Sequence, residues 1–416
     1  MQLRNPAIGA VPTARVLAAL IALALVRVAG SQEPTTRVHR ADAIAAAAAR
    51  GPRLALARAD TLAAAAQLQS ARAWQNPALG ASYSKDAPQY HYTLDIPLDL
   101  PYQRRPRIAS ASASQRAARY RYAIERASVA MEADTTYTRA LAARAFAELS
   151  MRNARDADSL RRIAVARRDA GDASDLDVAL ATVTAGQEAN RATTDSMAMQ
   201  SALLDLQSVM GLGAGEVIIA LDDSLTAPPV ARMVAVKGVL LPVAAAGAQL
   251  ESASLAVQLE RRSVFGVPSL TVGFETGDLS GSGSERLPTV GLALPLPLFN
   301  RNGGPIALAR AEEARARAAL SWAEVQARTE LTRAQREQTA ALAKVGRDER
   351  LVEQANRVAA MALTAYREGA ASLPNVLEAQ RTARELLAQY VGDLADAWIA
   401  EAELRVLTLT AARNAP

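Results

Sequence analysis

The sequence predicts a mainly α-helical protein with a small β part, built from two repeats that each combine a β-hairpin with long antiparallel helices. Three observations predict this fold class. The sequence repeats itself at one fixed offset, two segments of about sixty residues contain almost no helix breaker, and four short segments alternate apolar with polar residues. Half of the 416 residues are apolar, which is too many for a disordered chain.

Composition excludes several classes of function. The net charge is +5, and the first thirty residues contribute three arginines and no acid, which leaves +2 for the rest. This balance gives no support for nucleic-acid binding. The chain has no cysteine and only two histidines, so we expect no disulfide, no lipid anchor on a cysteine and no metal site. Without a phosphate-binding loop or a catalytic triad, we expect neither an enzyme nor a bound cofactor.

Residues 1–30 have the pattern of a cleaved signal peptide. Arg4 and Arg15 precede the apolar run 16–26, and small residues follow at 28–30. The alternative is a short membrane anchor. Because eleven residues span ~17 Å as a helix and the hydrocarbon core measures ~30 Å, the length favours a signal peptide.

The internal duplication is visible at two places that share an offset of 198 residues. Residues 96–109 resemble residues 294–307, and residues 171–178 resemble residues 369–376. Two matches at one offset predict two structural repeats. The predicted organisation is repeat 1 over 31–212, a Gly/Pro-rich linker over 213–231, repeat 2 over 232–409 and a tail over 410–416.

Each repeat contains two segments with the period-two alternation of β-strands. In the second repeat, for example, the apolar positions of one segment run from Val290 to Leu296. Polar turn residues separate the two segments of each repeat. The pattern predicts β-hairpins over 79–98 and 268–298.

Long helices follow each hairpin. No glycine or proline occurs between Arg107 and Ala170, and Gly346 is the only one between Ile306 and Glu368. Alanine dominates the apolar positions, which permits close packing of helices as in a coiled coil. The predicted long helices cover 103–169, 172–210, 305–368 and 372–409, and shorter helices precede the hairpins at about 37–73 and 232–262.

The four predicted strands have about 8–10 residues each, which suits a membrane β-span of ~9–11 residues. Four strands cannot close a barrel alone. About eight strands are the minimum, and a barrel of eight is filled by its own side chains, so an open lumen needs at least three copies of the chain. We expect the apolar positions to face lipid, namely Tyr90, Tyr92, Leu94 and Ile96. We expect the polar positions to face a wet lumen, namely His91, Asp95 and Glu275.

Two other architectures are compatible with part of this pattern. A soluble periplasmic coiled-coil scaffold would explain the helices, and a surface adhesin would explain a helical stalk. Neither requires an export signal together with paired hairpins of membrane length.

The ordered set of motifs resembles the TolC-type outer-membrane efflux proteins over about residues 37–409. The motifs are Asn76-Pro77-Ala78-Leu79, the PL-x-L segments at Pro97 and Pro295, and the glycine turns at 171–178 and 369–376. The segment 294–309 is particularly similar to the heavy-metal branch, which serves cobalt–zinc–cadmium and copper pumps.

The resemblance implies a homotrimer in the outer membrane, with a 12-strand barrel and a periplasmic helical tunnel. It implies two protein partners, a periplasmic adaptor (membrane fusion) protein and an inner-membrane pump of the resistance–nodulation–division (RND) type. The cargo implied by the branch is a heavy-metal cation, and the alternatives are a drug or a secreted polypeptide.

The glycine turns are the predicted periplasmic tip. Gly171 and Gly369 each fit a left-handed helix C-cap, and Ser174, with Asp177 three residues later, fits the next N-cap, as Ser372 does in the second repeat. Capping alone accounts for these residues, and the resemblance adds contact with the adaptor. Capping also accounts for the arginines just before the glycines, Arg167, Arg168 and Arg367.

The resemblance further implies a gate near the tip. Asp177 and Tyr366 fall on latch positions, whereas Ala371 stands where the family pattern has an arginine. At the two positions of the family's acidic rings, this sequence has Asn375 and Glu378. Three copies of Glu378 would form a carboxylate ring that favours cations, and the alternative is a solvated helix residue.

Overall fold

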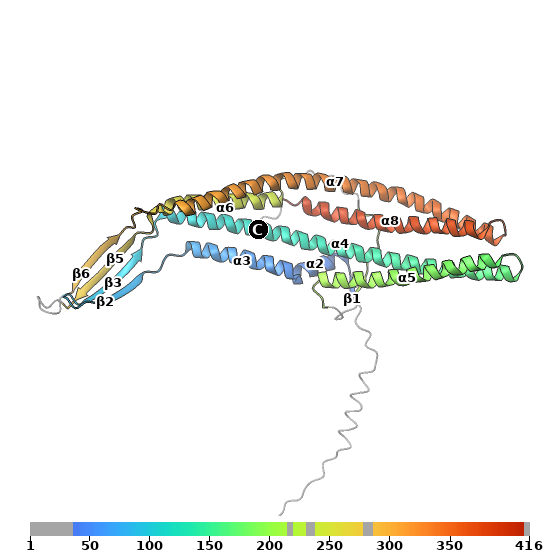
Figure 1. Cartoon of the computed structure of the whole chain (residues 1–416), viewed down its shortest axis with the longest axis horizontal. Helices are drawn as coiled ribbons and strands as arrows, with labels where there is room; N and C mark the ends of the chain where they lie inside the picture. The colour runs from blue at the N-terminus through green and yellow to red at the C-terminus, as the bar shows by residue number, and fades with distance from the viewer. Residues whose placement is uncertain (1–35, 214–218, 230–237, 278–285, 412–416) are drawn as a thin grey trace, which may run out of the picture.

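The computed structural model describes residues 36–213, 219–229, 238–277 and 286–411. The predicted signal peptide and parts of the predicted linker and tail lie outside the described residues. The molecule is elongated, with a small sheet at one end and the turns of two long helical hairpins at the other (Figure 1). The predicted fold class, mainly α-helical with a small β part, is confirmed.

The sheet joins both predicted hairpins into one layer. Its strands are β2 (Ala78–Tyr83), β3 (Tyr90–Pro97), β5 (Ser269–Thr276) and β6 (Leu287–Ala293), in the order β2-β3-β5-β6 with antiparallel neighbours. The pairing of β3 with β5 links the two repeats.

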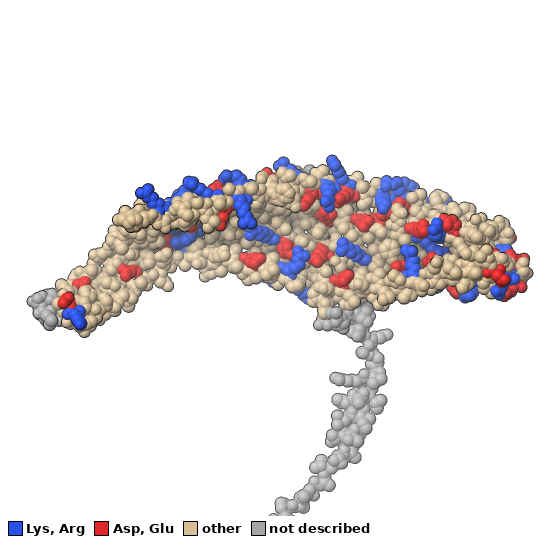
Figure 2. All heavy atoms as spheres, viewed as in Figure 1, with Lys and Arg blue, Asp and Glu red and all other residues tan. Residues whose placement is uncertain are grey.

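The register gives the sheet one apolar and one polar face. Directly paired residues lie on the same face, and Tyr92 pairs with Phe274 while its neighbour His91 pairs with Glu275. The apolar face carries Leu79, Tyr83, Tyr90, Tyr92, Leu94, Ile96, Leu270, Val272, Phe274, Val290 and Leu292. On the side of the molecule in Figure 2, the sheet shows few charged atoms except near its hairpin loops.

Two long helical hairpins run away from the sheet. They consist of α4 (Pro101–Asp169) with α5 (Asp175–Val209), and of α7 (Gly303–Arg367) with α8 (Leu373–Leu407). The 69 residues of α4 correspond to a length of about 100 Å. In the described part of the chain, no helix combines the length and apolar character that a membrane span requires.

The shorter helices differ from the predicted bounds. The expected helix over 37–73 consists of α2 (Arg40–Arg50) and α3 (Pro52–Arg72), because Pro52 cannot donate a backbone hydrogen bond inside a helix and instead begins a new one. The second short helix, α6 (Leu241–Arg262), ends as predicted but begins later. A 3₁₀ turn over Ser263–Phe265 connects it to β5.

The prediction that the last strand reaches Leu296 was wrong. β6 ends at Ala293, and the reason lies in Pro295 and Pro297, which have no amide hydrogen to donate to a ladder. Leu294 and Leu296 therefore lie in an exposed connection. The helix that follows begins at Gly303, two residues before the predicted start, after Asn302 in a left-handed conformation (φ 57°).

A second, two-stranded parallel sheet lies midway along the helices. It pairs β1 (Thr36–Val38) with β4 (Ile219–Leu221), so the N-terminal segment is attached to the segment between the repeats. The buried Tyr137 of α4 donates a hydrogen bond from its hydroxyl to Asp223 Oδ2 at 2.7 Å, just after β4. This sheet was not predicted from the sequence.

Candidate functional site

The candidate site is the end of the two helical hairpins farthest from the sheet. Both turns have the hydrogen bonds of a Schellman motif. After α4, the amides of Gly171 and Asp172 donate to the carbonyls of Arg168 and Arg167, and after α7, the amides of Gly369 and Ala370 donate in the same pattern. Gly171 and Gly369 have φ values of 84° and 80°, the left-handed region that favours glycine.

The helices that leave these turns begin differently. Ser174 caps α5 with a reciprocal capping box, in which its hydroxyl accepts from the Asp177 amide and the Asp177 carboxylate accepts from the Ser174 amide, both at 3.2 Å. Ser372 stands at the N-cap of α8 but makes no side-chain cap, and Pro374 follows in the first turn. Asp177 therefore has a local structural partner in this chain.

A small apolar core joins the two hairpins at the tip. It contains Leu160, Ala164, Ala181, Tyr366, Leu373 and Val376, which come from α4, α5, α7 and α8. Tyr366 is only 3% exposed, and its hydroxyl has no hydrogen-bond partner among the described residues. Burial raises the pKa of Tyr366, although the nearby Arg167 opposes the shift.

Arg167 connects the ends of α4 and α7 directly. Its Nη1 donates to the backbone carbonyl of Tyr366 at 2.5 Å, and its guanidinium carbon lies 4.7 Å from the centre of the Tyr366 ring. The expectation that capping alone accounts for Arg167 was wrong, because the side chain crosses to the other hairpin. A basic residue therefore contacts the predicted latch tyrosine, but it comes from the first repeat and not from position 371.

The predicted ring residues lie on the first turns of α8. Asn375 and Glu378 are exposed, and Glu378 Oε1 accepts a hydrogen bond from Arg381 Nη2 at 3.0 Å. Because both side chains of this pair are more than 60% exposed, the pair itself contributes little to stability.

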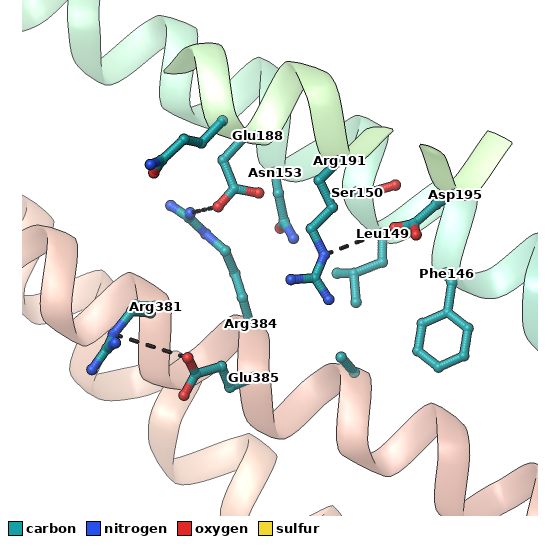
Figure 3. Close-up of a pocket in the computed structure, with 12 residues that line it drawn as sticks. Phe146, Leu149, Ser150, Asn153, Glu188, Arg191, Asp195, Arg381, Arg384 and Glu385 are labelled. Atoms are coloured by element: carbon teal, nitrogen blue, oxygen red, sulfur yellow. Dashed lines mark hydrogen bonds and ion pairs between the residues drawn. The ribbon is translucent and has the colours of Figure 1, made fainter. Parts of the chain in front are cut away.

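A groove of about 300 Å³ separates the two hairpins several helical turns from the tip, between α4, α5 and α8. Arg384 of α8 reaches across it to Glu188 of α5, with a distance of 2.5 Å between Nη1 and Oε1 (Figure 3). Both side chains are less than one-fifth exposed, so this ion pair is less screened than the surface pairs around it. Polar contacts thus join the two hairpins at Arg167 with Tyr366, at Arg384 with Glu188 and, still farther from the tip, at Arg405 of α8 with Asp134 of α4.

A carboxyl pair lies between α7 and α8 farther from the tip. Asp348 and Asp393 are both 5% exposed. Their mutual hydrogen bond, together with burial, raises the pKa of Asp348. Burial alone would also raise the pKa of Asp393, but its hydrogen bonds with Asp348 and with Lys344, whose Nζ lies 2.5 Å from Oδ1, outweigh burial and lower it. The pair therefore holds one proton more firmly than an isolated aspartate would.

The residues predicted for the lumen lie together on the polar face of the sheet. His91 Nδ1 lies 3.1 Å from Glu275 Oε1 across β3 and β5, and Asp95 accepts a hydrogen bond from the Thr271 hydroxyl on the same pair of strands. The pattern of strands was enough to place these three residues on one face, because the alternation determines the side of the sheet.

Comparisons with known proteins address the fold. Residues 242–408 match the family model described as outer membrane efflux protein. No curated protein matches the chain in sequence. Among solved structures, a membrane protein from Pseudomonas aeruginosa is similar with a TM-score of 0.74 and 20% identity, covering 89% of this chain and 93% of that one.

The outer membrane protein VceC from Vibrio cholerae is similar with a TM-score of 0.74 and 18% identity, over 89% of this chain and 96% of that chain. The structures of CusC are described as showing conformational changes that accompany folding and transmembrane channel formation. CusC is similar with a TM-score of 0.75 and 16% identity, over 92% of this chain and 94% of that chain. This chain has the fold of the outer-membrane efflux channels.

Within the efflux-channel fold, the side-chain contacts from one helical hairpin to the other were not predicted from the sequence. Arg167, Glu188 and Arg384 were assigned to no cross-hairpin contact, since each is an ordinary charged residue on a long helix. One sequence signal indicated that Arg167 and Tyr366 lie near each other. Arg167 comes four residues before Gly171 and Tyr366 comes three residues before Gly369, so each lies just before one of the two turns at the tip. The family model and VceC are described as outer-membrane proteins, and CusC as forming a transmembrane channel.

Proposed function

We propose that the protein is the outer-membrane channel subunit of a tripartite efflux system, in which three copies form a passive conduit gated at its periplasmic end. The observation that carries this proposal is the sheet, with one apolar face and two edges that have no partner. In the described part of the chain, neither β2 nor β6 pairs on its outer side. An apolar sheet with open edges is stable in lipid only when the edges are closed by other strands.

The duplication supports a specific way to close the edges. The pair Leu79–Leu94 of the first hairpin corresponds to Leu270–Leu292 of the second. By the same correspondence, the Leu94–Val272 pair between β3 and β5 would be repeated between Leu292 and Ala81 of the partner subunit. Both positions lie on the apolar face, so the repeated pairing keeps all apolar side chains on one side of the closed barrel.

The helices support the same arrangement. They lie in the order α3, α4, α6, α7, so α3 and α7 are the outer helices of the protomer. Both carry exposed apolar side chains, for example Leu62 at 65% and Trp322 at 66%. If α7 packs on the partner subunit's α3 as α4 packs on α6, these side chains become covered.

Disulfide cross-linking tests the proposal, since the natural chain has no cysteine. We expect Ala81→Cys with Leu292→Cys to give covalent trimers in the outer-membrane fraction. The control pair is Ala81→Cys with Gly291→Cys, which points to the opposite face and should cross-link poorly. A soluble periplasmic monomer that never cross-links would refute the channel and favour a coiled-coil scaffold.

The tip is the proposed gate and the proposed contact for the periplasmic adaptor. Asp177, Tyr366, Asn375 and Glu378 lie within nine residues of Gly171 or Gly369, where three copies would converge. The exposed turns at Ser174 and Ser372 are the surfaces that an adaptor could reach. Opening would require the two hairpins to separate at Arg167 and Arg384.

For the cargo we propose a heavy-metal cation, moved by an RND-type inner-membrane pump. The support is the segment 294–309, together with the carboxylates of the tip and of the polar sheet face. Loss of the channel should sensitise its host to copper, zinc or cobalt. Sensitivity to drugs alone, or loss of a secreted polypeptide, would instead identify one of the two alternative cargoes.

A further inference from the structure

The four connections between the sheet and the helices share one feature. Each has, in the connection itself or in the adjoining turn of its helix, an exposed aromatic residue and, within four positions, an exposed arginine. The aromatic residues are Trp74, Tyr102, Phe265 and Phe299, and the arginines are Arg72, Arg105, Arg261 and Arg301. We call these eight residues the junction collar. The chain has only three tryptophans and four phenylalanines, so their presence at these positions is a marked concentration.

The aromatic side chains of the collar are open to the surroundings. Phe299 is fully exposed, Trp74 and Phe265 are 65% and 53% exposed, and Tyr102 is 36% exposed. An exposed aromatic residue is costly in water but favourable at the boundary of a membrane, where one side is apolar and the other is wet.

The charges near the collar are strongly unbalanced. Three further arginines lie at the same helix ends, Arg104 and Arg107 in the first two turns of α4 and Arg262 at the end of α6, and the nearby acids are Asp99 and Glu260. The buried Asp99 is already bound by Arg107 at 2.6 Å and Arg104 at 3.3 Å. Within the described ranges, no hydrogen bond or ion pair is found for the guanidinium groups of the four collar arginines. They are available for an anionic ligand.

The position of the collar identifies the ligand. It lies where the apolar sheet face ends and the helices begin, which is the level of the lipid headgroups if the sheet spans a membrane (Figure 1). Arginines at this level can contact phosphates while their stems lie along apolar surface. A contact between copies is a poorer explanation, because it would cover only the outer connections at Trp74 and Phe299, whereas all four connections carry the pattern.

We propose that the junction collar binds the phosphates of anionic glycerophospholipids in the leaflet nearest the helices. This inference rests on the proposed function, since it requires the sheet to lie in a membrane. Three copies would place twelve such aromatic–arginine pairs around the base of the barrel.

The test compares lipid binding by a collar variant and a matched control. The collar variant is Arg105→Gln, Arg261→Gln and Arg301→Gln. The control is Arg328→Gln, Arg336→Gln and Arg350→Gln, which removes the same charge from exposed positions of α7 far from the sheet. Binding of phosphatidylglycerol and phosphatidylcholine to the detergent-purified protein is measured by native mass spectrometry.

We expect the natural protein and the control to prefer phosphatidylglycerol and the collar variant to lose that preference. Since each basic residue near an anionic surface contributes about fivefold in affinity, three substitutions should lower it by up to about a hundredfold and Arg301→Gln alone by about fivefold. An equal loss in the control, or no preference in the natural protein, would overturn the proposal. Displacement of the lipid by inorganic phosphate at equal concentration would also overturn it.

Trimer formation and conductance are measured on the same samples. Heat-resistant, conducting trimers with no lipid preference would overturn the collar and leave the channel proposal standing. A protein that neither forms trimers nor enters a bilayer would overturn the channel proposal itself. Loss of trimers in Trp74→Ala with Phe299→Ala, while lipid binding per protomer is unchanged, would assign these aromatics to a contact between copies.

Discussion

Arg167, in the last turn of α4, holds the end of α7 through the backbone and the ring of Tyr366. The two residues belong to different repeats, and the guanidinium lies 4.7 Å from the ring centre while Nη1 donates to the carbonyl at 2.5 Å. The carbonyl oxygen of Tyr366 also accepts a hydrogen bond from the Gly369 amide. The same oxygen therefore takes part in the turn after α7 and in the contact between the hairpins. A single side chain therefore connects the geometry of one turn to the position of the other hairpin.

We predict that Arg167→Ala loosens the tip. The substitution removes a charge-assisted hydrogen bond and a cation–π contact, which together are worth about 2–4 kcal/mol when partly buried. Amide hydrogen exchange over residues 366–372 should accelerate, and single channels should open more often. The control is Arg168→Ala, whose guanidinium pairs only with nearby acids of the same turn. Equal effects of both substitutions would show that the contact with Tyr366 is unimportant.

We predict that Tyr366→Phe is nearly neutral, whereas Tyr366→Ala is severely destabilising. The buried hydroxyl has no hydrogen-bond partner among the described residues. Its removal therefore breaks no hydrogen bond and removes the cost of burying an unpaired polar group. Truncation to alanine leaves a cavity in the tip core and should cost about 3–5 kcal/mol. Thermal melting followed by far-UV circular dichroism measures both. A large loss in Tyr366→Phe would indicate that the hydroxyl has a partner in the assembled channel.

We predict that Gly171→Ala destabilises the first turn by about 1–2 kcal/mol, because the residue must keep a positive φ. A Cβ at this position would meet no atom within 4 Å, so the cost comes from the backbone alone. Gly171→Asn should recover part of the loss, since asparagine tolerates the left-handed region better than alanine does. Hydrogen exchange at residues 170–174 reports the effect, and equal values for both variants would contradict the backbone explanation.

The repeats and the alternation of residues are local patterns. They were sufficient to predict the long helices, the four strands of the larger sheet except for the end of β6, and the side of that sheet on which His91, Asp95 and Glu275 lie. The pairing of β3 with β5 depends on how the two repeats approach each other, which no local pattern encodes. The same holds for β1 with β4, whose strands of three residues are too short to show a period. The contact of Arg167 with Tyr366 was missed for a related reason, since helix capping already accounts for an arginine at that position.

We predict that Asp348→Asn removes a pH dependence of stability. The pKa of Asp348 is raised in the folded chain, so its contribution is complete below the unfolded value of about 4 and declines as the pH rises through the folded value. Asparagine keeps a hydrogen-bond donor toward Asp393 at every pH. The variant should therefore gain stability over the natural protein as the pH rises from about 4 to neutral.

Melting temperatures measured across this range test the prediction. The control is the exposed Asp156→Asn, which should follow the natural protein at every pH. Parallel curves for the natural protein and Asp348→Asn would show that the two carboxyl groups do not share a proton.

We predict that Glu378→Ala weakens the preference of the channel for cations. If three copies converge at the tip, the substitution removes three carboxylates from the narrowest part of the conduit, and such rings set ion selectivity. The matched control is Glu353→Ala, an exposed glutamate of α7 that forms an i,i+4 pair with Arg357, as Glu378 pairs with Arg381 one turn away. Reversal potentials in planar bilayers under a salt gradient measure selectivity, and block by divalent cations gives a second reading. If both variants keep the natural selectivity and block, Glu378 is a solvated helix residue and the gate lies elsewhere.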